Sequence, residues 1–311
     1  MLKVNNKIIS LDSKISNSDI NFISHAHSDH ISSLSSSNEV LASIETVELL
    51  NIIKNKKINQ VSLPNWIELL DAGHILGSKQ LYVINNETGE RIIYTGDYNL
   101  QQSNVCKPIQ IKNADKLIID STYYDPKIKF LEKYIIIDSI KKWVEQNIKD
   151  NIIIFGVYAL GKAQELINIV NEIGITPIVS KKISDISSIY NRFGYNLNYI
   201  SLYDDDFNEK DLKHNFVGII NTRSLSKLKA DLSNFYNKKV ITAVATGLAE
   251  TFKFNVDMQF TLSDHADFSQ ALEYIDAVGA DEIFTFGNNG KIFAKNLADK
   301  GYNAKPFTYY I

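Results

Sequence analysis

Cysteine is nearly absent from this chain, which contains a single one, Cys106, among 311 residues. One cysteine excludes both an internal disulfide bond and a zinc site built from thiolates. Long apolar runs are missing too: a membrane-spanning helix needs ~18 consecutive apolar residues, and the longest candidate, around 152–160, suits a single strand. Because the first residues also lack the apolar segment of a secretory signal, we expect an intracellular, cytoplasmic protein without membrane contact.

Neither sign of charge is in excess. The 33 basic and 36 acidic residues give a net charge of −3, so the composition alone does not predict a polyanionic partner. Metal ions bound in a cleft can nevertheless reverse the local sign of charge. A hydrophobic share of 44% with 22% charged residues excludes a disordered or fibrous chain and indicates a globular one.

The pattern of apolar residues changes near residue 130, which predicts two structural regions in a chain of about two domains' length. Before that point, short strands alternate with polar turns. Beyond it, segments of helical periodicity alternate with apolar strands at 151–155, 176–179, 216–220 and 239–243. This alternation predicts a mostly parallel sheet covered by helices.

Histidine is rare, yet three of the six histidines lie in the sequence His25-Ala-His-Ser-Asp-His30, directly after a strand predicted at 21–24. Alternate residues of an extended segment point the same way, so His25 and His27 can reach one metal ion. Asp29 and His30, just past the turn, can face a neighbouring ion. Imidazole and carboxylate ligands without thiolate suit Zn²⁺ and also accept Mn²⁺ or Fe²⁺.

Four residues elsewhere are weaker candidates when taken alone. His74 is flanked by glycines that permit a close approach of the backbone, and Asp97 and Asp120 each follow an apolar strand. An aspartate in such a place is often just a turn or cap residue. Lys162 begins a predicted helix, where it can hold a phosphate or simply be solvated.

Taken together, these segments resemble the β-CASP nucleases of the metallo-β-lactamase superfamily. The resemblance rests on the histidine cluster, His74 and Asp97, and on the segments 117–123, 158–165 and 262–268, which read LIIDSTY, YALGKAQE and LSDHADF. It extends from about residue 20 to residue 310 in the expected order. The short, single-chain exonucleases of archaeal RNA-processing type or of DNA-ligase-associated type are the most similar members.

The resemblance implies an α/β fold in which a metallo-β-lactamase αββα sandwich, residues 1–129 and 253–311, is interrupted by a β-CASP domain at 130–252. That insertion is expected to be a mostly parallel sheet flanked by helices. The resemblance also implies one Zn²⁺ held by His25, His27 and His74, a second ion held by Asp29 and His30, and Asp97 bridging the two. Mn²⁺ is an alternative metal.

Asp120 and His265 are the catalytic residues that the resemblance implies. Asp120 matches the family's acidic residue at a strand end, and His265 matches its phosphate-contacting histidine. Phosphodiester hydrolysis requires an activated water and a stabilised leaving oxygen. We therefore hypothesise that His265, oriented by Asp120, contacts the scissile phosphate or protonates the leaving oxygen. Lys162 is a weak candidate for binding phosphate.

The sequence departs from the family pattern at Phe286. RNA-cleaving members usually have a histidine before glycine at the end of the last strand, where it completes the second metal site, but this chain has Phe286-Gly287. Phenylalanine cannot bind a metal, so we expect the second ion to be held more weakly than the first. The DNA-repair branch also has an apolar residue there, which leaves RNA and DNA both open.

The sequence thus predicts a two-metal nuclease, acting as an exonuclease on single-stranded RNA or DNA in RNA processing or DNA repair. A DNA ligase or an RNA-processing protein is a candidate partner. Two alternatives stay open: a hydrolase of small esters or thioesters on the same scaffold, and a catalytically inert nucleic-acid-binding paralogue. The size of the insertion argues against the first alternative, and the intact ligands argue against the second.

Overall fold

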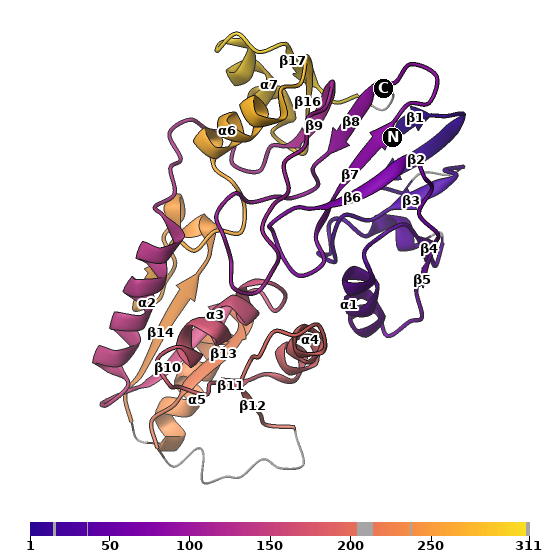
Figure 1. The fold of residues 1–311 in the computed structure, drawn as a ribbon. Helices are drawn as coiled ribbons and strands as arrows, with labels where there is room; N and C mark the ends of the chain where they lie inside the picture. Colours follow the sequence, from indigo (N-terminus) through magenta and orange to yellow (C-terminus); the bar gives the residue numbers. More distant parts are fainter. Residues whose placement is uncertain (15–16, 36, 204–213, 237, 309–311) are drawn as a thin grey trace. The chain divides into compact units, whose positions relative to one another are not determined.

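The structure is a computed structural model that describes residues 1–308 apart from 15–16, 36, 204–213 and 237 (Figure 1). The chain divides into two compact units. Met1–Lys129 and His265–Ile311 form the first unit, and Phe130–Asp264 form the second. In the part of the chain that the structure describes, no helix is both long and apolar enough to cross a membrane.

A mixed sheet dominates the first unit, and its described strands lie in the order β17-β16-β9-β8-β7-β6. The neighbours β6, β7 and β8 are antiparallel, whereas β8, β9, β16 and β17 run parallel. The bounds are β6 (Ile67–Asp71), β7 (Lys79–Ile84), β8 (Arg91–Tyr94), β9 (Lys116–Asp120), β16 (Glu282–Phe286) and β17 (Ala304–Pro306). The consecutive antiparallel strands β7 and β8 form a hairpin.

Smaller sheets and three helices complete the first unit (Figure 1). One sheet has the order β1-β2-β3 and the other pairs β4 with β5. These strands are β1 (Leu2–Val4), β2 (Lys7–Leu11), β3 (Ile20–Phe22), β4 (Glu39–Val40) and β5 (Asn59–Gln60). The helices are α1 (Ile44–Lys54), α6 (Phe268–Val278) and α7 (Gly290–Ala298).

Alternation along the strands creates two cores, one on each face of the mixed sheet. In β9, Leu117 and Ile119 pack with α6 and α7, whereas Ile118 packs with the β1-β2-β3 sheet. Successive side chains of a strand point to opposite faces, so both faces of this apolar strand are buried. The result is a helix layer, the mixed sheet and the smaller sheet in succession, as expected for the sandwich.

The second unit contains an entirely parallel sheet in its described residues, with strand order β12-β11-β13-β10-β14-β15. The central strands β10 (Ile152–Val157) and β14 (Val240–Ala245) are buried along their whole length. The other strands are β11 (Ile178–Val179), β12 (Ile200–Ser201), β13 (Val217–Asn221) and β15 (Met258–Phe260). This confirms the expected α/β fold with a mostly parallel sheet.

Helices α2 (Lys133–Asn147), α3 (Lys162–Asn171), α4 (Lys181–Arg192) and α5 (Leu225–Tyr236) flank this sheet. The strand β15 pairs with β14 and extends this parallel sheet, so the second unit continues to Asp264. The sequence predicts an insertion at 130–252, and those bounds stay a prediction. The helix α4 was missed by the sequence analysis.

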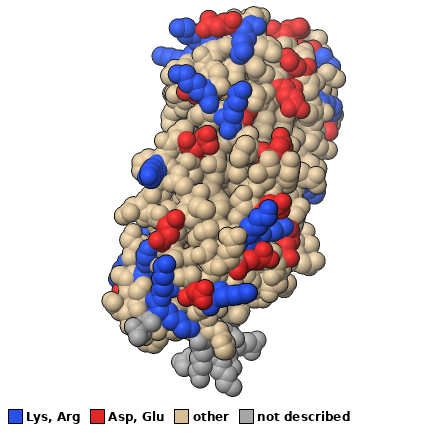
Figure 2. All heavy atoms as spheres, turned by 90° about the vertical axis from the view of Figure 1, so that its left-hand side faces the viewer, with Lys and Arg blue, Asp and Glu red and all other residues tan. Residues whose placement is uncertain are grey.

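Charged side chains of both signs are interspersed on the face of the molecule drawn in Figure 2. Lysine and arginine side chains lie next to aspartate and glutamate side chains there, rather than in a separate field. This distribution agrees with the small net charge of −3. That face therefore offers no extended basic surface to a polyanion.

Candidate metal centre

The histidine cluster follows β3, and the carboxylate of Asp12 holds its first residues in place. Asp12 comes directly after β2, which is the parallel neighbour of β3. Both oxygens of this buried carboxylate accept hydrogen bonds from Ser24, at 2.7 Å from the backbone nitrogen and 2.6 Å from the hydroxyl. His25 is therefore preceded by an anchored residue.

Two other loops bring His74 and Asp97 to the cluster, and each contains a glycine at positive φ. Gly73 has a φ of +75°, and a side chain there would put its Cβ 2.3 Å from the carbonyl oxygen of Asn99. Gly96 has a φ of +54°, and its Cβ would lie 2.5 Å from the Cβ of Ser24. Only glycine tolerates both the conformation and the close approach.

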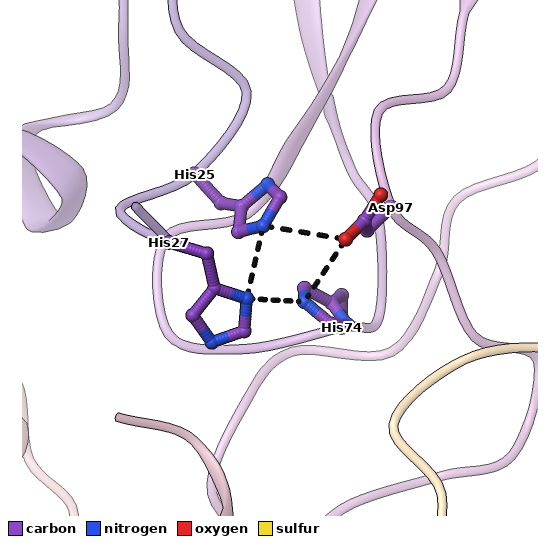
Figure 3. A group of neighbouring side chains, drawn as sticks. All are labelled: His25, His27, His74 and Asp97. Carbon is purple, nitrogen blue, oxygen red and sulfur yellow. Dashed lines mark hydrogen bonds and ion pairs between the residues drawn. The ribbon is translucent and has the colours of Figure 1, made fainter. Parts of the chain in front are cut away.

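Four ligand atoms converge at this point, as Figure 3 shows. His27 Nδ1 lies 3.1 Å from His25 Nε2 and 3.1 Å from His74 Nε2. Asp97 Oδ2 lies 3.5 Å from His25 Nε2 and 3.7 Å from His74 Nε2. A tetrahedral ion with ligands at ~2.0–2.1 Å separates its ligand atoms by ~3.3–3.4 Å. The four residues therefore fit a tetrahedral ion such as Zn²⁺.

The electrostatics of His25 and Asp97 favour the metal-binding form of each residue. Complete burial lowers the pKa of His25 well below its usual value, and the nearby His30 lowers it further, which keeps the ring neutral. Burial raises the pKa of Asp97, but His30 and His265 outweigh that effect and hold it well below its usual value. A neutral imidazole and an ionised carboxylate are the forms that bind metal.

A second group forms around His30 on the other oxygen of Asp97. Asp97 Oδ1 lies 3.3 Å from His30 Nε2, while Asp29 Oδ2 lies 3.7 Å from the same nitrogen. Burial lowers the pKa of His30, but Asp97 and Asp12 outweigh it and raise the pKa to about 12. The carboxylates thus favour positive charge beside this ring, whether from a proton or from a metal ion. Asp29 is 79% exposed and is the least constrained member.

Asp120 and His265 lie beside these groups. Asp120 ends β9, and His265 lies shortly before α6, whose N-cap is Asp267. His265 Nδ1 is 3.7 Å from Asp120 Oδ2, and His265 Nε2 is 3.9 Å from Asp97 Oδ2. These distances exceed a hydrogen bond. The structure thus places the pair at the centre without a direct bond between them, and together with Asp97 their ligand atoms form a further potential metal group.

Sequence analysis missed Asp12, which acts on the other side of His30. Its Oδ2 accepts the hydrogen bond from His30 Nδ1 at 2.8 Å if that nitrogen carries the proton, and it also accepts one from the Tyr94 hydroxyl at 2.9 Å. A carboxylate on the remote nitrogen fixes the ring orientation and raises the basicity of the ligating nitrogen. The available signal was the same as for Asp120: an aspartate directly after an apolar strand.

Lys162 and Phe286, the other two residues singled out in the sequence, have partners that the sequence did not indicate. Lys162 is in the second unit, where its Nζ lies 3.0 Å from Asp264 Oδ2 and 3.5 Å from Glu165 Oε2. Protein carboxylates thus lie beside its buried ammonium group, and a phosphate-binding role for Lys162 stays a prediction. Phe286 lies opposite Asp120 in the register of β16 and β9, and its ring packs on Tyr94 with 4.7 Å between centroids.

No protein-family model matches the sequence. The sequence does match several curated proteins. It is 26% identical over 297 residues to a probable DNA ligase from Opitutus terrae, and the match covers 91% of this chain and 28% of that protein. It is 31% identical over 220 residues to an RNase J-like protein from Methanocaldococcus jannaschii, covering 67% of this chain and 48% of the relative. The 5′ exonuclease Apollo from Danio rerio is 28% identical over 176 residues, or 49% of this chain and 30% of that protein.

The chain spans less than half the length of each of these curated relatives. Among solved structures, it is similar to a protein of unknown function from Enterococcus faecalis V583, with a TM-score of 0.63 and 14% identity. That match covers 92% of this chain and 78% of the other. At this identity the match concerns the fold alone.

Proposed function

Because this chain belongs to the β-CASP family of the metallo-β-lactamase superfamily, we propose that it is a metal-dependent nuclease that hydrolyses phosphodiester bonds of single-stranded nucleic acid. The convergence of three imidazole nitrogens and Asp97 at the spacing of a tetrahedral ion carries this proposal. Met1–Lys129 with His265–Ile311 would be the metallo-β-lactamase domain, and Phe130–Asp264 the β-CASP domain.

The metal ligands in this proposal come from the first unit alone. His25, His27 and His74 would hold one ion, Asp29 and His30 a second, and Asp97 would contribute one oxygen to each. The donor set of nitrogen and oxygen without sulfur favours Zn²⁺ and accepts Mn²⁺. Such ions supply Lewis acidity that polarises phosphate oxygens and makes water nucleophilic near neutral pH.

The second ion would be the weaker one. Phe286 fills the position beside Asp120 with an aromatic ring packed on Tyr94, so it adds no ligand to the second group. Asp29 is largely exposed and is not held by a close contact to His30. Fewer and looser ligands give a lower affinity, so we propose one tightly bound ion per chain and a second that binds at higher metal concentration.

His265 and Asp120 would handle the phosphate and its protons. His265 lies within 3.9 Å of the ligand oxygen of Asp97 and is 18% exposed, so its ring borders the metal centre and remains accessible. Asp120, 3.7 Å from His265 Nδ1, can orient the ring. His265 would then contact the scissile phosphate or protonate the leaving oxygen.

The relatives guide the choice of substrate and partner. One is named an RNase J-like protein and another a 5′ exonuclease, so we propose exonucleolytic cleavage of single-stranded RNA or DNA. The relative named a probable DNA ligase aligns with this chain over 28% of its length, which makes a DNA ligase a candidate partner. An RNA-processing protein is the corresponding candidate for an RNA substrate.

Digestion of 5′-labelled single-stranded RNA and DNA of matched sequence, with and without added Zn²⁺ or Mn²⁺, tests the proposal. We expect metal-dependent shortening of at least one oligonucleotide, and loss of that activity in His265→Ala and Asp120→Asn with metal content unchanged. His214→Ala, which alters an exposed histidine of the second unit, is the matched control. If neither oligonucleotide is cut while a small aryl ester is hydrolysed, the nuclease proposal is wrong.

A further inference from the structure

A cavity outside the metal centre lies in the second unit, at the carboxyl ends of its parallel strands. Its volume is about 290 Å³, and its lining residues are Ser180, Ile220, Asn221, Lys227, Leu228 and Asp231. Ser180 directly follows β11, while Ile220 and Asn221 end β13, the neighbouring strand. The remaining residues, Lys227, Leu228 and Asp231, belong to α5.

The topology of the sheet explains why a cavity forms between these two strands. The chain leaves β11 through α4 and enters β12, on the outer side of β11. It leaves β13 through α5 and enters β14, on the opposite side, beyond β10. Connections that depart in opposite directions leave a crevice between neighbouring strands, and open parallel sheets bind ligands at such points. Figure 1 shows β11 and β13 with these helices around them.

Two features at this cavity can attract an anion, namely the N-terminus of α4 and the side chain of Lys227. Ser180 is the N-cap of α4, but its hydroxyl makes no capping hydrogen bond, and the first turn of α4 contains no acidic residue. The first two residues of the helix are Lys181 and Lys182. No acidic residue in the first turn of α4 therefore offsets the positive end of the helix dipole. Lys227 adds a cation from α5, and it forms no ion pair within the described part of the chain.

The other lining residues suit a nucleoside. The side-chain oxygen of Asn221 accepts a hydrogen bond from the backbone nitrogen of Arg223 at 3.1 Å. The side-chain NH₂ group of Asn221 can therefore donate to a ligand. The carboxylate of Asp231 can accept hydrogen bonds from two vicinal hydroxyls. Ile220 and Leu228 provide an apolar wall against which a flat base can pack.

We propose that this cavity is a binding site for a nucleoside monophosphate. Ser180 and Lys227 bind its phosphate, Asp231 accepts from its ribose hydroxyls, and the base lies against Ile220 and Leu228 with Asn221 donating to it. The residues of this site are separate from those of the metal centre, so the inference does not depend on the proposed nuclease activity.

Calorimetric titration of the full chain with AMP tests the site. Lys227→Glu should weaken AMP binding about tenfold or more, because it replaces a charge-assisted contact with a repulsive one. Lys142→Glu, which makes the same charge change at an exposed residue of α2, should leave the affinity unchanged. His27→Ala should also leave it unchanged, because His27 belongs to the metal centre.

Two further titrations test the chemical class of the ligand. We expect dAMP to bind more weakly than AMP, because it lacks one of the two hydroxyls assigned to Asp231. Inorganic phosphate should bind more weakly than either. Equal affinity for phosphate and AMP would overturn the nucleoside assignment. AMP binding that is lost in His27→Ala but kept in Lys227→Glu would overturn the site itself, since the nucleotide would then occupy the metal centre.

Discussion

Replacement of Lys133 by methionine tests whether the buried charges of the second unit act as one neutral set. Lys133 Nζ lies 2.9 Å from Glu165 Oε1, and both side chains are 7% exposed. Lys162 Nζ lies 3.5 Å from the other oxygen of Glu165 and 3.0 Å from Asp264 Oδ2. The charges of these two lysines and two carboxylates sum to zero, so the loss of one lysine leaves this group of residues with a net negative charge.

The expected cost is large because methionine keeps the apolar length of lysine and removes only its charge. Breaking a buried ion pair from one side costs about 3–5 kcal/mol, and Lys133→Met should lower the free energy of unfolding by that amount. Lys141→Met is the matched control on the same helix. Its Nζ lies 2.5 Å from Glu172 Oε2, but these side chains are 23% and 37% exposed, and such a pair contributes about 0–1 kcal/mol.

Urea unfolding followed by the fluorescence of Trp143 measures both variants. The chain has two tryptophans, and Trp66→Phe leaves Trp143 as the single reporter. Trp143 belongs to the second unit, where its ring centroid lies 5.7 Å from that of Phe155 and 5.8 Å from that of Phe260. The signal therefore reports the unit that contains the mutated ion pairs.

The pH dependence gives a second criterion. Burial raises the pKa of Glu165, but Lys133 and Lys162 outweigh it, so the folded pKa lies below the usual value of 4.5. The contribution of Glu165 to stability is thus present above pH 4.5 and is lost as the pH falls through the lower, folded pKa. Without Lys133 the pKa of Glu165 rises, so Glu165 takes up a proton at a higher pH in the variant than in the wild-type protein. Protonation removes the buried negative charge and with it the destabilisation. The destabilisation measured at pH 7 should therefore shrink toward pH 4.

A loss of less than about 1 kcal/mol for Lys133→Met, equal to that of Lys141→Met, would refute this reasoning. A large loss that is the same at pH 7 and pH 4 would also contradict it, because the cost would then come from packing rather than from charge.

Three further predictions concern the metal centre. His27→Ala should remove the tightly bound ion, so metal analysis should find less than half an ion per chain, whereas His214→Ala keeps the wild-type content. Asp12→Asn should weaken metal binding about 10–100-fold, because His30 loses its orienting carboxylate. Competition with a chelator measures the affinity, and an unchanged affinity would show that Asp12 only shapes the loop. Phe286→His should raise the affinity for a second ion, measured by titration of Mn²⁺. A wild-type chain that already holds two ions tightly would rule out the weak second group.

The sequence was most informative where function depends on residues close together along the chain. His25, His27 and His30 lie on one short segment after a strand, so their proximity follows from their closeness along the chain and needs no knowledge of packing. The same holds for the parallel sheet of the second unit, whose strands β10 and β14 are continuous apolar runs bounded by helices.

The sequence alone did not identify residues that act through partners distant along the chain. Asp12 contacts His30 and Tyr94, which are 18 and 82 positions away, and an aspartate after a strand is equally consistent with a turn. Lys162 lies at the start of helix α3, as the sequence predicted. Its ion pair with Asp264, at 3.0 Å between Nζ and Oδ2, depends on the folded chain and was not predictable. The end of the second unit likewise depended on the pairing of β15 with β14.

The amino-acid sequence by itself determined the strand–helix alternation after residue 130 and the histidine segment, because apolar periodicity and the chemistry of ligand side chains are local properties. The sandwich fold and the ligand roles of His74 and Asp97 were implied by the family resemblance. Only the tertiary structure decided which carboxylate supports His30, which carboxylates lie beside Lys162 and where a cavity opens between β11 and β13. Those features arise from the order of strands in a sheet and from burial. Both are set by contacts between segments far apart in the chain, where the charge of a side chain does not reveal its partner.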